Sequence, residues 1–508
     1  MANFGLLILL YRKILMAKEN SLFLLIRSLS KSEKRYFKLF CTREASGNNY
    51  LKLFDAIDQQ VNYDEAAIKA AFSGEKFVRQ MHVTKNYLAK LILKSLRNFH
   101  TGFSKDAELK DALRNVELLY NKELVNHSRR ELARAEAIAR SNEMDTALVE
   151  ISNWRRKLEQ AAQPHNYAAF RAVIEEQRNA IKRLENTNAY WQLAIEVSGN
   201  VFSSAGAPLT NANLLDDPAG AHTLEAKVIH YNITYLRLLQ QDKQTEAEQK
   251  LFELIGLLER HPDRLRDEPG LYVSSINNLL SFLVFTKKYS RAIELIQKAK
   301  SVYDSWSITS ENRSLLRQII RTYNIELEIH RDLKSYDRQA NFIESTESFV
   351  NANTHKMPRE YLVSFWFQLA TIHFMRKDFR RSLYWINQLL NARFKGIRND
   401  LIVQTQLLNL IVHLEQQNLF VLRYFVDSTR RYMKKVKDIQ PYENILLKFF
   451  IRIAKVPLFE YKEAFVELKE ALFPENRPSL IPDDAQGYID YSAWINEKAT
   501  KGFRKPPA

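Results

Sequence analysis

Residues 362–394 read LVSFWFQLATIHFMRKDFRRSLYWINQLLNARF, and this stretch decides the fold. Apolar and aromatic residues recur in it at intervals of three and four, in two runs separated by the polar pair Lys377-Asp378. The first run is Leu362, Phe365, Trp366, Leu369 and His373, and the second is Phe379, Leu383, Ile386, Leu390 and Phe394. This spacing is typical of helices that bury one stripe. It predicts two helices joined by a short turn, a helical hairpin.

The rest of the chain has the composition of a nearly all-helical protein. Its 508 residues include only 12 glycines and 13 prolines, where roughly 7% and 5% of residues are usual. Because strands, tight hairpins and phosphate-binding loops need these residues, the composition argues against β-sandwiches, Rossmann-type folds and P-loop enzymes. The single cysteine, Cys41, excludes an intramolecular disulfide and a thiolate metal cluster, and it favours a reducing compartment, the cytoplasm.

Similar hairpins are expected along the second half of the chain, beginning near residues 223, 269, 309, 358, 399 and 440. A period in the forties with two helices per unit predicts an all-α solenoid, in which each hairpin completes its core by packing on its neighbours. The predicted organisation is an N-terminal extension over 1–15, a helical N-terminal domain or cap over 16–105, the solenoid over 106–473, and a proline-rich linker, short helix and basic tail over 474–508.

Two hairpins carry the pattern of a known repeat. The residues concerned are Ile276, Leu279, Leu283, Tyr289, Ala292, Ile296 and Ala299 in one, and Trp366, Leu369, Ala370, Phe379, Ser382 and Ile386 in the other. Both hairpins resemble degenerate tetratricopeptide repeats. The resemblance implies a right-handed superhelix that binds other proteins. Leu283 and His373 stand where an aromatic residue is usual, and Ser382 stands where alanine is usual.

The N-terminus gives two further indications. The apolar run Phe4–Tyr11 is too short to span a bilayer, which needs about 20 residues. The segment Asn20–Phe40 resembles the opening of a family of uncharacterised proteins from Bacteroidota. The resemblance supports Met16 as the true start and a cytoplasmic location, and it implies no activity. Membrane association of the first residues stays an alternative.

The net charge of +16 is concentrated in two zones. Residues 355–455 contain 18 basic and 7 acidic residues. Their basic side chains cluster at two predicted turns and on one face of the predicted helix Leu419–Lys437. The candidate partner-binding residues are Arg376, Lys377, Arg380, Arg381, Arg393, Lys395, Arg398, Arg423, Arg430, Lys434 and Lys437. If they face one edge, they form a positive surface for an acidic protein or peptide. A merely solvated face is the other interpretation.

The second basic zone lies in residues 1–110. Lys90, Lys94 and Arg97 share a stripe of a predicted helix, Phe77–Phe99, and this helix follows a turn at Ser73–Glu75 and a short helix. The arrangement resembles a helix-turn-helix. The alternative function is therefore a nucleic-acid-binding or regulatory protein that uses this N-terminal unit, with these three residues as contacts, and the basic zone over 355–455.

No catalytic pattern emerges from the sequence. None of the eleven histidines lies four residues from another, and adjacent acids such as Glu175-Glu176 point to different sides of a helix. We therefore expect a non-enzymatic binding scaffold without a cofactor or metal ion. The first helix of each hairpin is predicted to face a partner peptide or helix. The candidate residues are Asn277, Asn278, Gln368 and Thr371.

Overall fold

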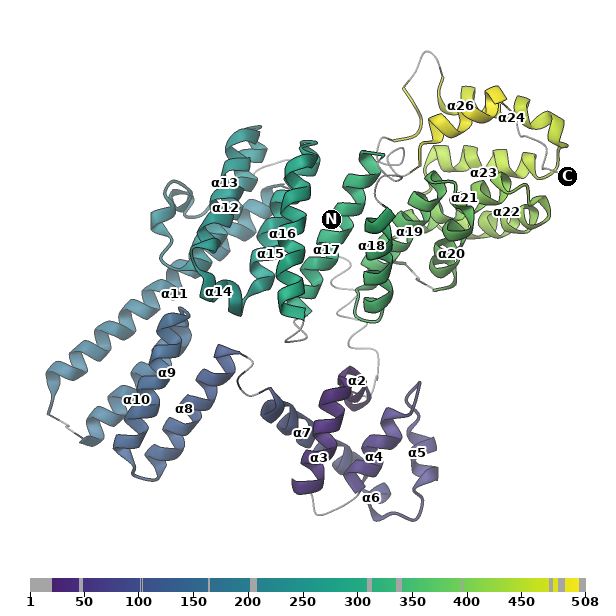
Figure 1. Cartoon of the computed structure of the whole chain (residues 1–508). Helices are drawn as coiled ribbons and strands as arrows, with labels where there is room; N and C mark the ends of the chain where they lie inside the picture. The colour runs from purple at the N-terminus through teal and green to yellow at the C-terminus, as the bar shows by residue number, and fades with distance from the viewer. Residues whose placement is uncertain are drawn as a thin grey trace. The chain divides into compact units, whose positions relative to one another are not determined.

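The computed structural model describes residues 21–44, 49–100, 102, 104–162, 165–201, 208–307, 313–334, 340–392, 394, 396–474, 478–482 and 489–501. Every regular element in these ranges is an α-helix or a short 3₁₀ helix, which confirms the all-α class. The chain divides into two compact units (Figure 1). The first unit holds the described residues up to Tyr190 together with Ala221–Ala226, and the second holds the others. The predicted extension over 1–15 lies outside the described residues, as do Met16 and residues 502–508 of the basic tail.

The helices of the first unit are α2 (Ser21–Ser28), α3 (Lys31–Glu44), α4 (Asn49–Asp58), α5 (Glu65–Ala71), α6 (Lys76–Arg79), α7 (Met81–Phe99), α8 (Lys105–Asn121), α9 (Val125–Ser141), α10 (Asp145–Ala162) and the first part of α11 (Tyr167–Val201). Helices α2–α7 share one core, in which Ile26, Phe37, Phe54 and Leu88 are fully covered. Cys41 lies in this core, and burial raises the pKa of its thiol. A buried thiol with a raised pKa is a packing residue.

The predicted single helix Phe77–Phe99 is wrong in one respect, because the structure divides it at Gln80. The Gln80 backbone has φ −118° and ψ 35°, outside the helical range, and its N–H donates to the Phe77 carbonyl three residues back. Phe77 and Met81, on either side of this break, both reach the core. Helix α7 therefore starts at Met81.

The second unit holds the second part of α11 and all but the first three residues of α12. Its helices from α12 onward form successive hairpins, and their starts confirm the predicted positions to within four residues. The hairpins are α12 (Leu224–Gln240) with α13 (Gln244–Glu259), α15 (Pro269–Phe285) with α16 (Tyr289–Ser307), α17 (Arg313–Asp332) with α18 (Ala340–Asn353), α19 (Arg359–Met375) with α20 (Phe379–Asn391), α21 (Asn399–Glu415) with α22 (Leu419–Met433), and α23 (Pro441–Ile453) with α24 (Tyr461–Leu472). The remaining elements are α14 (Pro262–Asp267), α26 (Tyr491–Lys501) and the 3₁₀ helices η1 (Ala212–Leu215), η2 (Pro218–Gly220) and η3 (Leu458–Glu460).

Packing in the second unit proceeds from each hairpin to the next (Figure 1). The first helices form a continuous row, since α15 packs on α17, α17 on α19, α19 on α21, and α21 on α23. The second helices α16, α20 and α22 each pack on the first helix of their own hairpin and of the next. Helix α19 is consequently enclosed, and every residue from Leu362 to Phe374 is buried. Sequential stacking of helical hairpins is thus confirmed for this unit.

Polar side chains of the first helices bind one another across the row. Asn277 of α15 is fully buried and donates to the Gln318 carbonyl of α17 at 2.8 Å. Gln368 of α19 donates to Asn324 of α17, also at 2.8 Å. The prediction that Asn277, Gln368 and Thr371 face a partner is therefore wrong, because all three side chains are buried. The first two bond to the neighbouring first helix, and the Thr371 hydroxyl donates to the Gln368 carbonyl of its own helix. Buried amides bonded in this way fix how neighbouring helices align.

The same turn joins the helices of most hairpins. The second residue after the first helix lies in the left-handed region, with φ between 49° and 60°, and its N–H donates to the carbonyl three residues back. The residues at this position are Glu123, Glu143, Asp242, Lys287, Lys334, Lys377 and Gln417. Where the next residue is described, its N–H donates to the carbonyl five residues back, as Asn418 does to His413 at 3.0 Å. This is the Schellman arrangement, which usually carries glycine. In this glycine-poor chain, residues with a Cβ therefore adopt the left-handed conformation at these turns, at a cost in backbone strain.

We expect Gln417→Gly to stabilise the second unit by about 1 kcal/mol, because glycine adopts φ 56° without the cost that a Cβ imposes. Urea unfolding of the full chain measures the change. The matched control is Gln416→Gly one residue earlier, where φ is −77° and ψ −1° and glycine should destabilise by roughly 0.5 to 1 kcal/mol. A Gln417→Gly protein that is less stable than the unchanged chain would show that this turn is not strained.

The described C-terminal helix α26 folds back onto earlier helices of the second unit. The Tyr491 hydroxyl donates to Gln404 of α21 at 2.9 Å. The Trp494 indole N–H and the Lys498 ammonium both donate to Glu415 of α21, each at 2.7 Å. Helix α26 also packs on α24, where Trp494 meets the Phe465 ring edge-on. It therefore covers part of the row of first helices.

Candidate functional site

The cations predicted between residues 355 and 455 fall at two opposite edges of the second unit. Arg376, Lys377, Arg380 and Arg381 lie at the turn between α19 and α20, and we call these four residues the turn cluster. Arg398 immediately precedes α21, at the far end of α20, whose 13 residues span about 20 Å. Arg393 and Lys395 lie outside the described residues. The predicted set therefore does not form one surface.

Helix α22 carries the remaining predicted cations. Because α20 and α22 run in the same direction, the last turn of α22 lies at the edge that also holds Arg398. Arg430, Lys434 and Lys437 lie there, and we call these three residues the end cluster. Arg423 lies near the start of α22 and donates to the Ala454 carbonyl at 2.8 Å.

Ion pairs engage only part of this set. Arg381 pairs with Glu347 at 3.4 Å, and Arg398 pairs with the exposed Asp400 at 2.8 Å. The other three residues of the turn cluster, and all of the end cluster, form no ion pair with any described residue. Uncompensated cations in a cluster attract anionic partners.

Exposed aromatic rings lie at the same edge as the turn cluster. Tyr384 is 49% exposed and lies one turn beyond Arg380 on α20. Phe420 and Tyr424, on the first two turns of α22, are 87% and 66% exposed. Arginine beside exposed aromatic side chains is typical of surfaces that contact other molecules.

The repeated turn places three lysines in equivalent positions. Lys287, Lys334 and Lys377 are the left-handed residues of the turns that follow α15, α17 and α19. These three helices pack side by side, so the lysines project from one edge in a row, which we call the lysine row, with a spacing of roughly 8 to 10 Å. Lys334 already holds a carboxylate, that of Asp490 just before α26, at 2.8 Å. Lys287 and Lys334 were not among the predicted residues, because they align with Lys377 only when the hairpins are superposed on their turns.

In the N-terminal helices, Lys90, Lys94 and Arg97 are exposed on one stripe of α7, as predicted. The exposed Val83 and Tyr87 extend the same stripe toward the start of the helix. Residues 76–105 include seven lysines and arginines but neither aspartate nor glutamate. This absence of acidic residues over 30 positions is a second signal of a basic surface, and it is visible in the sequence. The Lys94 ammonium also lies 5.6 Å from the centre of the Phe40 ring.

Buried histidines occur at one repeated position in the second unit. His330, His373 and His413 each lie four residues before the left-handed residue of their turn. His373 is fully buried and its Nε2 bonds to Glu347 at 2.8 Å, whereas its Nδ1 has no hydrogen-bond partner among the described residues. Nδ1 of the buried His413 has no hydrogen-bond partner in the part of the chain that the structure describes, and its ring stacks on Phe425. Among the described residues, no three His, Cys, Asp or Glu side chains are grouped to hold a metal ion.

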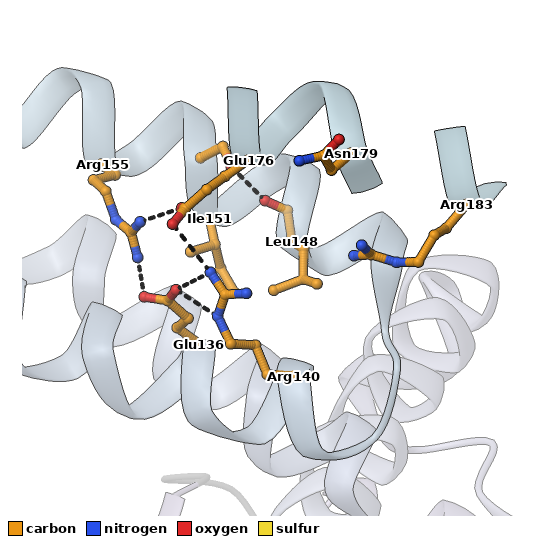
Figure 2. A pocket seen from close by; sticks show the side chains of 9 residues that line it. Glu136, Arg140, Leu148, Ile151, Arg155, Glu176, Asn179 and Arg183 are labelled. Atoms are coloured by element: carbon orange, nitrogen blue, oxygen red, sulfur yellow. Dashed lines mark hydrogen bonds and ion pairs between the residues drawn. The ribbon is translucent and has the colours of Figure 1, made fainter. Parts of the chain in front are cut away.

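The first unit contains a pocket of about 110 Å³ between α9, α10 and α11 (Figure 2). A closed ring of four charges forms one side of it: Glu136 and Glu176 each bind both Arg140 and Arg155. The Arg155–Glu176 contact measures 2.5 Å. Burial alone would raise the pKa of Glu136, but the two guanidiniums lower it below its usual value. The ring joins three helices whose residues are distant in sequence.

No protein-family model matches the chain, and a search of curated proteins finds no significant match. None of the described helices is long and apolar enough to cross a membrane.

Proposed function

We propose that the chain is a binding scaffold without catalytic turnover, and that its second unit holds an extended acidic protein segment along the lysine row and the turn cluster. In this proposal the stacked hairpins form a superhelix of the tetratricopeptide-repeat kind. The observation that carries it is the equivalent placement of Lys287, Lys334 and Lys377 in three successive turns.

The spacing of the row suits an extended peptide. Lysines roughly 8 to 10 Å apart match every third residue of an extended peptide in the polyproline II conformation, which rises about 3.1 Å per residue and returns to the same face every three residues. Arg376 and Arg380 add charge at one end of the row, and Phe420 and Tyr424 offer apolar contacts at the same edge. Lys334 already pairs with the carboxylate of Asp490, which supports a carboxylate as the kind of anion that the lysine row binds.

Charge reversal tests this proposal. We expect the triple variant Lys287→Glu, Lys377→Glu and Arg380→Glu to weaken binding of a fluorescein-labelled peptide with glutamate at every third position by on the order of tenfold or more, measured by fluorescence anisotropy. All three positions are exposed, so the fold should persist. The matched control reverses the end cluster with Arg430→Glu, Lys434→Glu and Lys437→Glu, and it should change the affinity by less than about threefold. Equal losses in both variants would mean that net charge alone attracts the peptide.

The acid-free segment 76–105 favours nucleic-acid binding by α7 as a second candidate function. The same assay separates the two candidates when single-stranded RNA or duplex DNA replaces the peptide and Lys90, Lys94 and Arg97 are reversed to glutamate. A nucleic-acid complex should lose affinity steeply between about 50 and 200 mM salt. Undiminished binding by the reversed α7 variant would eliminate this candidate.

A further inference from the structure

We propose that the pocket between α9, α10 and α11 binds a single carboxylate group, held between Arg140 and Arg183. Figure 2 shows the Arg183 guanidinium reaching into the pocket from α11, across from that of Arg140 on α9. This site is separate from the lysine row and does not depend on the function proposed for it.

Both guanidiniums are fixed by acids but keep donors for a ligand. Arg140 uses Nε and Nη2 on Glu136 and Glu176, and Arg183 uses Nε and Nη2 on the buried Asp145. No hydrogen bond or ion pair with a described residue engages Nη1 of either arginine. Because the side chains are already held, a ligand would bind without ordering them first.

The other pocket residues define the size and charge of the ligand. Leu148 and Ile151 of α10 are buried and line the pocket with apolar atoms. The charges of the three lining arginines (Arg140, Arg155 and Arg183) are balanced by the carboxylates of Glu136, Glu176 and Asp145, so the pocket is neutral. Hydrogen-bond donors that point at the ligand, rather than a net positive charge, would hold the anion. A monovalent, planar carboxylate suits two guanidiniums, and a doubly charged phosphate is disfavoured in a neutral setting.

Asn179 of α11 provides the test, because its exposed amide lines the pocket and bonds to no described residue. In Asn179→Asp the new carboxylate supplies the anion within the chain. We expect acetate, exchanged for chloride at constant ionic strength, to raise the Tm of the unchanged protein by about 3 °C at roughly ten times its Kd. Asn179→Asp should have a higher Tm without acetate and should lose the response to acetate.

The matched control is Asn188→Asp, which makes the same charge change at an exposed position of α11 away from the pocket. It should keep the full acetate response, as the unchanged protein does. The proposal is overturned if acetate leaves the Tm of the unchanged protein where chloride does, or if Asn179→Asp responds to acetate as Asn188→Asp does. A larger stabilisation by inorganic phosphate than by acetate would overturn the assignment to carboxylate. A free carboxylate and an acidic side chain of a partner share this chemistry, and comparing acetate with a glutamate-containing peptide distinguishes them.

Discussion

Trp385→Ala should lower the free energy of unfolding of the second unit by about 3 to 5 kcal/mol. The Trp385 side chain, on α20, is 2% exposed. Its indole N–H donates to Glu347 of α18 at 2.9 Å, and the same carboxylate oxygen bonds to His373 of α19. Alanine would remove both the packing and one donor to a largely buried carboxylate. Urea unfolding of the full chain gives the loss, and amide hydrogen exchange should locate it in α18–α20.

Two further variants separate packing from hydrogen bonding. Trp385→Phe keeps most of the buried ring but not the donor, so we expect a smaller loss, of about 1 to 3 kcal/mol. Tyr384→Ala, at the neighbouring exposed position, should change the stability by no more than about 0.5 kcal/mol. If Trp385→Ala cost no more than Tyr384→Ala, Trp385 would not be a core residue.

Acidification should destabilise the second unit through its buried histidines. Burial, aided by the positive charge of Lys300, lowers the pKa of His330 to about 4, and burial also lowers the pKa of His413. Below the usual histidine pKa of about 6.5, the unfolded chain binds a proton at His330 that the folded chain does not. Stability therefore falls as the pH falls. The loss from His330 should amount to roughly 3 kcal/mol between pH 6.5 and pH 4.

A comparison of variants isolates this effect. Glu326 opposes it, because burial raises its carboxyl pKa and its contribution to stability is instead lost as the pH rises. The measured quantity is therefore the difference in unfolding free energy between the unchanged protein and His330→Phe, followed from pH 7 to pH 4. Phenylalanine preserves the contact with the Phe342 ring, which lies 4.3 Å from that of His330. His355→Phe, at an exposed position, is the control and should show no such trend. A difference that does not change with pH would show that His330 binds a proton as readily in the folded chain as in the unfolded chain.

The helices were predictable because burial of one stripe leaves a period of 3.6 in the sequence. The hairpin beginning at Arg359 was predicted within one residue for this reason. The fate of polar residues on those helices was not predictable in the same way. Asn277 and Gln368 look like exposed residues in sequence, but the neighbouring hairpin covers them and bonds to them. Whether a neighbouring hairpin buries a polar side chain depends on residues some 40 positions away in the sequence.

The candidate surfaces were only partly predictable. A basic zone is visible in composition, and the turn cluster was identified from it. Whether Arg380 and Lys434 face one edge depends on the direction of α20 and α22, which the charge count does not contain. The lysine row was missed because its members are 47 and 43 residues apart, so no fixed period reveals them. The Arg140–Arg183 pocket depends on three helices meeting, and no local motif marks it.

The fold-back of α26 has a consequence for synthesis of the chain. Gln404 and the Tyr491 that covers it are separated by 87 residues. At roughly 5 to 20 residues per second, a ribosome needs on the order of 4 to 17 s to make that interval. During this time α21 has been made without Tyr491, Trp494 and Lys498. The Gln404 Oε1 atom and the Glu415 carboxylate then lack these donors, while the Gln404 amide can already donate to Tyr442 and Glu443 of α23. A nascent chain interrupted before Tyr491 keeps that surface uncovered, which gives cellular quality control a means to distinguish an interrupted product from one that has passed this point.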